Sequence, residues 1–278
     1  MNTMHAILIA ILQGATELFP VSSLGHAVVL PAMVDWAINQ KSPEFLPFLV
    51  LLHLGTATAL LVYFWRDWLA LALGVLGISN PQRTRESRRV LMLIVIATIP
   101  AVIIGFTLEK FVRGLFGSPV VAASFLIVNG VMLLAAERLR TRKVATRPMA
   151  TLSIVDAVVI GFWQCLALIP GISRSGATIV GGLLRGVDHA GSAHFSFLIA
   201  TPIILGATVL EVPKLLHEAV PPGVFQTAAI AAVVAGIVAW LSTAFLMRYF
   251  RSHEQAGLNP FGIYCIVFGS IALAVILY

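Results

Sequence analysis

The stretch Q-G-A-T-E-L-F-P-V-S-S-L-G-H, residues 13–26, decides the fold class, because it puts polar and ionisable side chains into otherwise apolar sequence. A second stretch of this kind, P-G-I-S-R-S-G-A-T, covers residues 170–178. Each stretch contains a proline, Pro20 or Pro170, and each has long apolar flanks. A charged side chain inside a bilayer costs about 2.5–3.5 kcal/mol on insertion scales, so such residues indicate a functional site. The two stretches therefore predict a polar site within a membrane.

The composition of the chain is that of an integral membrane protein. Hydrophobic residues make up 59% of the 278 residues and charged residues 11%, and the mean hydropathy is +0.97. A soluble domain carries roughly 25% charged residues. Because a helix needs about 20 apolar residues to cross a bilayer, we expect an all-α polytopic protein forming a single membrane domain over residues 1–278. The predicted spans lie near residues 45–65, 90–108, 117–136, 194–210, 222–247 and 258–277.

The distribution of basic residues predicts the orientation of these spans. Of the 18 Lys and Arg residues, 13 lie on one side of the predicted spans and four on the other. This asymmetry assigns the richer side to the cytoplasm. The net charge of +6 is then explained by topology and by contact with anionic membrane lipid, so we expect no nucleic-acid partner. The cytoplasmic set is Arg66, Arg83, Arg85, Arg88, Arg89, Arg138, Arg140, Arg142, Lys143, Arg147, Arg185, Arg248 and Arg251, and the other set is Lys41, Lys110, Arg113 and Lys214.

Two further segments, residues 3–36 and 152–186, contain the polar stretches and are interrupted at their centres. Proline beside serine or glycine favours a turn over a continuous helix. Each segment is therefore predicted to be a re-entrant helical hairpin that enters and leaves by one face. Irregular backbone at membrane depth persists only where protein or a water-filled cavity satisfies it.

The two hairpins also predict an inverted repeat. An offset of 151 residues superimposes several identities, and three spans separate the hairpins, so their entrances face opposite sides of the membrane. Broken helices that meet near the midplane are typical of inverted-repeat membrane proteins. We expect repeat 1 over about residues 1–140 and repeat 2 over about 150–278, with the first hairpin entering from outside. The aligned pairs are Gln13 with Gln164, Ser22 with Ser173, Gly25 with Gly176, and Leu54-Gly55 with Leu205-Gly206.

The first hairpin carries candidate metal ligands and a candidate nucleophile. Gln13 and Glu17 are four residues apart and share one helix face, where their oxygens could bind a hard divalent cation. Alternatively, Glu17 is a single buried carboxylate held by hydrogen bonds. Ser22 and Ser23 follow the proline, and we expect one of them to cap the second half-helix. His26, three residues after Ser23, could activate that hydroxyl as a nucleophile.

The second hairpin carries a candidate anion pocket around Arg174. Its guanidinium suits phosphate oxygens, and a helix starting there would direct its free N–H groups to the same point. Alternatively, Arg174 pairs with Glu17 as a bridge between the hairpins, and we expect some of this pairing without ligand. The surrounding residues that favour the anion pocket are Ser173, Ser175, Gly176 and Thr178.

Two other ionisable residues are predicted to have structural roles. His53 lies in the middle of a predicted span and is interpreted as a core histidine. Asp156 is expected at the start of the second hairpin's first helix, where an acid interacts favourably with the helix dipole.

These motifs carry a family resemblance. The pattern [E/Q]-x-x-x-E, then P-V-S-S-x-G-H, then P-G-x-S-R-S-G-A-T is similar to the undecaprenyl-pyrophosphate phosphatase (bacitracin-resistance) family. The likeness extends to F-W-Q-C-L-A-L-I-P-G at 162–171 and F-S-F-L-I-A-T-P at 195–202. It implies six transmembrane helices plus two re-entrant hairpins, and often a homodimer. It also implies a bacterial inner-membrane enzyme that converts the C55 prenyl pyrophosphate lipid to its monophosphate.

The resemblance further implies roles for individual residues. Ser23 would be the nucleophile and His26 its proton-transferring partner, while Arg174 with Ser173 would hold the pyrophosphate. Glu17 with Gln13 would bind Mg²⁺ or Ca²⁺. Many members have Glu in place of Gln13, so the neutral amide here is expected to weaken the cation site.

Two other functions are alternatives to the diphosphatase activity that the resemblance implies. Type-2 phosphatidic-acid phosphatases use S-R-x5-H, but the position of that histidine is occupied here by Val180. The serious alternative is a transporter or flippase of a lipid phosphate or anion, because inverted repeats with broken helices are a transporter architecture. A serine and a histidine beside a carboxylate favour the enzyme.

Overall fold

The computed structural model describes residues 3–34, 36, 45–108, 112, 114–115, 117–140, 147–217 and 224–278. Every regular element within these residues is helical, and none of them forms a strand. The predicted all-α class is therefore confirmed. Several positions used in the sequence predictions lie outside the described residues: Lys41, Lys110, Arg113, Arg142, Lys143, and the first two residues of the predicted span 222–247.

Helices long and apolar enough to cross a membrane match the predicted spans. Five described helices meet this condition alone, and large apolar side chains such as Phe106 and Val209 are among their most exposed residues, as expected next to lipid. The remaining prediction, 45–65, corresponds to α3 (Phe45–Tyr63), which reaches spanning length together with α4 (Trp65–Val75), from which it is bent by 75°. The five helices are α5 (Pro81–Thr107), α7 (Pro119–Arg140), α10 (His189–His217), α11 (Val224–Ser252) and α12 (Asn259–Leu277).

Both interrupted segments are helix pairs with a break between them, as the sequence predicts. The first pair is α1 (Thr3–Thr16) and α2 (Ser23–Met33). In the second pair, α8 (Ile154–Cys165) continues into the short η2 (Leu166–Leu168) before the chain turns into α9 (Arg174–Leu184). A further short 3₁₀ helix, η1 (Met149–Thr151), precedes α8.

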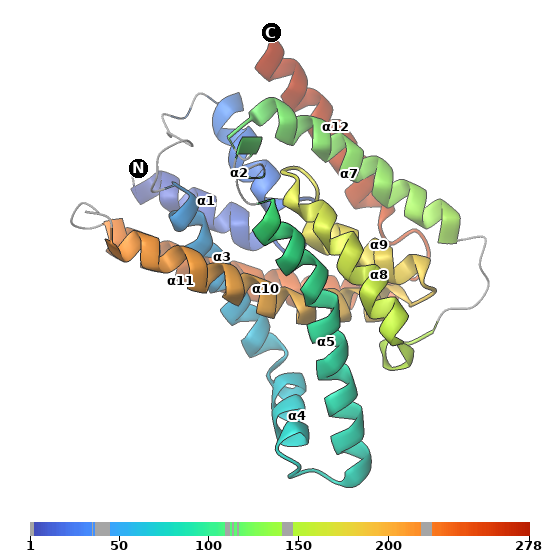
Figure 1. Ribbon diagram of the computed structural model, residues 1–278. Coiled ribbons are helices and arrows are strands. Elements are labelled where there is room, and N and C mark those ends of the chain that lie inside the picture. The colour runs from blue at the N-terminus through green and yellow to red at the C-terminus, as the bar shows by residue number, and fades with distance from the viewer. Residues whose placement is uncertain are drawn as a thin grey trace.

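The helices of the two halves pack in exchanged pairs. Helix α1 packs against α11 of the second half, and α8 packs against α5 of the first. Helix α7 lies along α12, whereas α4 and the start of α5 project together from the other side of the molecule (Figure 1). The two helix breaks are thereby enclosed between helices of both halves.

In each interrupted segment, a glycine lets the first helix approach a helix of the other half of the chain closely. A Cβ added to Gly14 of α1 would lie 2.4 Å from the Ala235 carbonyl oxygen of α11. A Cβ added to Gly161 of α8 would lie 2.6 Å from the Ala97 carbonyl oxygen of α5. Both distances are far inside van der Waals contact, so any larger residue would push the helix, and the break that follows it, away from its support.

The start of α8 is fixed by Asp156, as predicted. Ser153 and Asp156 form a capping box, and the Asp156 carboxylate also accepts hydrogen bonds of 2.6 Å from Arg147 and from Arg185. Burial by itself would raise the pKa of this carboxyl, but the hydrogen bonds from Ser153 and the two arginines hold it well below its usual range. The ionised acid therefore anchors α8 to the end of α9.

Candidate active site

The two helix breaks share the same capping hydrogen bond. Ser22 caps α2 by accepting a hydrogen bond of 3.2 Å from the Gly25 N–H, and Ser173 caps α9 by accepting one of 3.1 Å from the Gly176 N–H. These are the pairs that the 151-residue offset superimposes. Ser22 has a φ of 67°, an uncommon backbone conformation for a residue with a side chain. The expectation that one serine of the Ser22-Ser23 pair is a cap is confirmed, and Ser23 is left free for another role.

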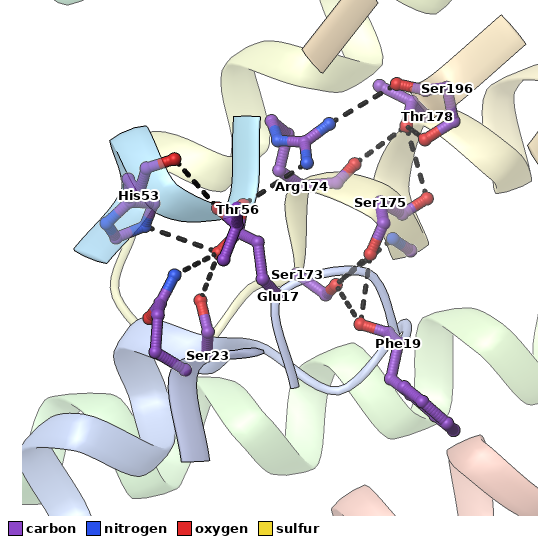
Figure 2. Close-up of polar contacts among 12 residues, drawn as sticks. Glu17, Phe19, Ser23, His53, Thr56, Ser173, Arg174, Ser175, Thr178 and Ser196 are labelled. Carbon is purple, nitrogen blue, oxygen red and sulfur yellow. Dashed lines mark hydrogen bonds and ion pairs between the residues drawn. The ribbon is translucent and has the colours of Figure 1, made fainter. Parts of the chain in front are cut away.

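Hydrogen bonds join the two breaks directly. The Phe19 carbonyl oxygen accepts bonds from the hydroxyls of Ser173 and Ser175, at 3.3 and 3.0 Å (Figure 2). Asn129 of α7 adds a bridge, because its Nδ2 donates to the Pro20 carbonyl at 2.9 Å and its Oδ1 accepts from the Ser173 N–H at 3.0 Å. Asn129 is fully buried. The irregular backbone of each hairpin is thus satisfied by protein rather than by lipid.

Glu17 is the centre of the polar cluster that results. Its Oε2 accepts a hydrogen bond of 2.5 Å from the Ser23 hydroxyl and one of 2.9 Å from Gln13 Nε2. His53 Nε2 of α3 lies 3.3 Å from the same oxygen. On the other side, Arg174 donates to Oε1 at 3.2 Å (Figure 2). The carboxylate therefore connects the predicted nucleophile of the first hairpin with the arginine of the second.

Arg174 is held at the start of α9 by more than its ion pair. Its second terminal nitrogen donates to the Ser196 carbonyl oxygen of α10 at 3.4 Å. The pairing with Glu17 that was expected without ligand is present. The guanidinium still lines the pocket described below, where its remaining N–H groups can bind an anion.

The serines and threonine around Arg174 divide into two groups. Ser22, Ser23 and Ser173 line the pocket. The structure does not bring Ser175, Gly176 or Thr178 to its surface: the Ser175 hydroxyl donates to Phe19, Gly176 packs near Pro20, and the Thr178 hydroxyl pairs with that of Ser196 at 2.6 Å. This second group supports the backbone of α9 and does not face the pocket.

His26 points away from Ser23. Its Nδ1 lies 2.7 Å from the Ser22 carbonyl oxygen, and its Nε2 lies 2.7 Å from the Tyr264 hydroxyl of α12. The ring also stacks on Phe268, with 4.7 Å between centroids. Both ring nitrogens are therefore engaged: Nδ1 bonds to the N-cap residue of its own helix, while Nε2 and the ring face hold α2 against α12. The structure does not bring His26 to the Ser23 hydroxyl, which donates to Glu17 instead.

The cluster forms the polar end of a pocket of about 240 Å³. Its polar lining consists of residues from both hairpins and His53. The rest of the wall is apolar and comes from α2, α3, α10 and the second break. A small polar end and a long apolar wall suit an amphiphile with an anionic head group. The apolar wall is Leu24, Leu49, Val50, Ala167, Leu168, Ile172, Ile203, Ile204 and Ala207.

Glu17 of the pocket and the buried Gln13 behind it fit a divalent cation that is shared with a ligand. Glu17 is the carboxylate of the cluster, and the buried Gln13 Oε1 beside it makes no hydrogen bond within the described residues. No group of three or more His, Cys, Asp or Glu side chains among these residues could hold a metal alone. Mg²⁺ is commonly bound by one or two carboxylates together with substrate phosphate oxygens. Gln13 and Glu17 match this incomplete type of site.

Two residues of the site were not predicted from the sequence. His53 was interpreted as a core histidine, and Asn129 was not singled out. A polar residue in an apolar span was the available signal for each, since such residues are rare in lipid unless they are partnered. Their partners, Glu17 and the two helix breaks, became evident only in the folded chain.

Comparison with known proteins identifies the family. The family model described as "Bacitracin resistance protein BacA" matches residues 6–271. The chain belongs to the BacA family. It is 63% identical to the undecaprenyl-diphosphatase of Granulibacter bethesdensis over 99% of this chain and 97% of that protein.

Other relatives carry the same name. The BacA-family chain is 56% identical to the undecaprenyl-diphosphatase of Acidiphilium cryptum, over 99% of both proteins. It is 47% identical to undecaprenyl-diphosphatase 2 of Chromobacterium violaceum, over 98% of both. The resemblance inferred from the motifs is confirmed across nearly the whole chain.

Proposed function

We propose that this chain is an undecaprenyl-diphosphatase in which Ser23 attacks the terminal phosphate of the lipid diphosphate. The hydrogen bond between Ser23 and Glu17, facing Arg174 across the two hairpins, is the observation that carries the assignment. The products are undecaprenyl monophosphate and inorganic phosphate. Release of the monophosphate restores the lipid carrier for cell-wall synthesis, and the family name fits a role in bacitracin resistance.

The reaction proceeds in two steps. Ser23 Oγ forms a bond to the terminal phosphorus, the bond from phosphorus to the bridging oxygen breaks, and Glu17 takes the hydroxyl proton. Water then attacks the phosphorus of the phosphoserine, the bond from phosphorus to Ser23 Oγ breaks, and Ser23 takes back the proton that Glu17 holds. The protons of the water leave with the inorganic phosphate. In this scheme Glu17 and not His26 is the proton acceptor, because Glu17 is the group within hydrogen-bond reach of the hydroxyl.

Electrostatic stabilisation comes from the second hairpin. Phosphoryl transfer depends mainly on positioning and on neutralising the charge of the phosphoryl oxygens. Arg174 supplies a fixed positive charge, and Ser173 lies beside it in the pocket wall. A Mg²⁺ or Ca²⁺ ion, held by Glu17 and Gln13, would supply further positive charge to the diphosphate oxygens when bound.

The membrane arrangement we infer has six spans and two re-entrant hairpins in an inverted repeat, over about residues 1–140 and 150–278. The exchanged packing of α1 on α11 and α8 on α5 supports it. Part of the pocket wall comes from the first half of α3 and the second half of α10, the ends that the basic residues assign to the outer side. This supports a pocket in the inner membrane that opens outward. We also propose that the protein forms a homodimer, as the family resemblance implies.

Phosphate release by the purified protein tests the activity. The protein in detergent should release phosphate from undecaprenyl diphosphate, and Ser23→Ala should retain less than about 1% of the rate, as expected for loss of a nucleophile. Ser124→Ala is the matched control, because that hydroxyl bonds only within α7. It should stay within about twofold of the native rate.

The same assay separates the enzyme from the transporter. A detergent solution has no second compartment, so turnover there can only be chemistry. Movement of a lipid phosphate in sealed vesicles, with no phosphate release in detergent, would overturn the proposal in favour of a flippase. Native turnover by Ser23→Ala would overturn the nucleophile assignment alone.

A further inference from the structure

His53 belongs to the pocket although it comes from neither hairpin. It lies in the middle of α3, lines the pocket, and has a side chain that is 25% exposed. Its Nε2 faces Glu17 Oε2 at 3.3 Å, the oxygen that also receives the Ser23 hydroxyl. A third segment of the chain therefore contacts the carboxylate that the two hairpins share (Figure 2).

The backbone of α3 fixes the orientation of the imidazole. His53 Nδ1 lies 2.7 Å from the Leu49 carbonyl oxygen, one turn earlier in the same helix. A carbonyl oxygen and a carboxylate oxygen can only accept, so Nδ1 donates to Leu49 and Nε2 donates to Glu17, and the ring carries both protons. The bond to Leu49 holds the ring with Nε2 directed into the pocket. This is the arrangement by which a second hydrogen bond sets the direction of a histidine's functional nitrogen.

The donors around Glu17 leave its carboxylate little rotational freedom. Oε1 is held by Arg174. Oε2 faces Gln13, Ser23 and His53. The hydrogen bond from Ser23 does not fix the carboxylate, because it is broken when the hydroxyl attacks. Arg174 is expected to turn toward the phosphates once substrate enters. His53 and Gln13 are then the donors left to hold the carboxylate in place during the attack.

We propose that His53 is a positioning residue, which holds the Glu17 carboxylate through Nε2 in the orientation that receives the Ser23 proton. This inference rests on the proposed function, in which Glu17 is the proton acceptor. Loss of the His53–Glu17 contact affects the step in which the Ser23–phosphorus bond forms. It should therefore change kcat more than KM. A hydrogen-bond donor of similar reach should replace the imidazole.

The test compares two variants at this position. His53→Leu removes the donor with little change in volume, and we expect kcat to fall about 10- to 100-fold while KM changes less than about threefold. His53→Gln places an amide N–H near the position of Nε2 and should restore kcat to within about fivefold of native. If His53 only filled space, His53→Gln would not restore kcat.

His194→Leu is a closely matched control. His194 has a side chain that is 24% exposed, and its Nε2 lies 3.3 Å from an Asp67 carboxylate oxygen. Neither residue lines the pocket. Its loss should leave kcat within about twofold. Thermal melting of the three variants in detergent identifies any change that arises from unfolding.

A double-mutant cycle shows whether His53 acts through Glu17. In a Glu17→Gln background, His53→Leu should cost less than about twofold, because both changes remove the same interaction. A native kcat for His53→Leu, or equal losses for the leucine and glutamine variants, would overturn the inference. So would a raised KM at native kcat, which indicates direct phosphate binding. Failure of the proposed function can be distinguished from failure of this inference, because in the first case Ser23→Ala itself stays active.

Discussion

The Asn129 side-chain oxygen accepts a hydrogen bond from the Ser173 backbone N–H at 3.0 Å, across the interface between α7 and the second helix break. The other end of the same amide donates to the Pro20 carbonyl in the first break. This buried side chain thus bridges the two hairpins, in addition to the bonds from Ser173 and Ser175 to the Phe19 carbonyl. Ser23 follows Pro20 by three residues and Arg174 directly follows Ser173, so the geometry of the pocket depends on this bridge.

Asn129→Leu should therefore lower both stability and activity. The change leaves the buried Ser173 N–H unpaired, and an unsatisfied buried group costs about 1–3 kcal/mol. The Pro20 carbonyl keeps only the longer bond from Cys265 Sγ, at 3.9 Å. We expect the melting temperature in detergent to fall by at least about 5 °C, and kcat to fall more than about 10-fold. The measurements are thermal unfolding and phosphate release.

Thr243→Val is the control for a buried polar group that bridges nothing. The Thr243 hydroxyl is fully buried and donates to the Ala239 carbonyl within α11. Its removal should cost less than about 1.5 kcal/mol and leave kcat unchanged. Equal effects of the two substitutions would mean that Asn129 has no special role in joining the breaks.

Glu17→Gln should abolish most of the activity while the pocket remains formed. The amide keeps the shape of the side chain but cannot take the Ser23 proton, so we expect kcat to fall about 10²- to 10⁴-fold. Phosphate release measures the loss, and Glu86→Gln, an exposed acid hydrogen-bonded to Gln82, is the control. A kcat within threefold of native would show that another group accepts the proton.

Gln13→Glu should strengthen cation binding. It places a second carboxylate one helical turn from Glu17, at the buried oxygen that now has no hydrogen-bond partner. Cation affinity rises with the number of charged ligands, so we expect Mg²⁺ to bind at least about 10-fold more tightly, as measured by calorimetry on the purified protein. Gln164→Glu, the equivalent change in the second hairpin, should have no such effect. Unchanged Mg²⁺ affinity in Gln13→Glu would place the cation elsewhere.

Gly55→Ala and Gly206→Ala should differ although the offset of 151 superimposes them. A Cβ added to Gly55 would lie 2.0 Å from the Ala232 carbonyl oxygen of α11, whereas nothing lies within 4 Å of one added to Gly206. Overpacking at Gly55 should cost about 1–3 kcal/mol, and Gly206→Ala should be neutral or slightly stabilising. Thermal unfolding of both variants measures this difference in stability. Similar melting temperatures would mean that α3 can move away from α11.

Local features of the sequence were sufficient for the class and for the positions of the helix breaks. Apolar windows predicted the helices because the hydrophobic requirement of a bilayer acts on each segment separately. Pro20 and Pro170-Gly171 predicted the breaks because proline and glycine limit the backbone wherever they occur. The Ser22 cap and the Asp156 anchor were predictable for the same reason, since a capping residue bonds within its own helix turn.

The sequence by itself thus determined a helical membrane protein with two polar hairpins. It also identified Glu17, Ser23 and Arg174 as candidate site residues. Tertiary structure alone decided that Ser23 meets Glu17 rather than His26, and that His53 and Asn129 complete the site. The Arg174–Glu17 contact joins residues 157 positions apart, and no local rule of spacing covers such a distance. A side chain with two hydrogen-bonding ends, such as His26, takes the partners that packing brings to it, and here packing brings Tyr264.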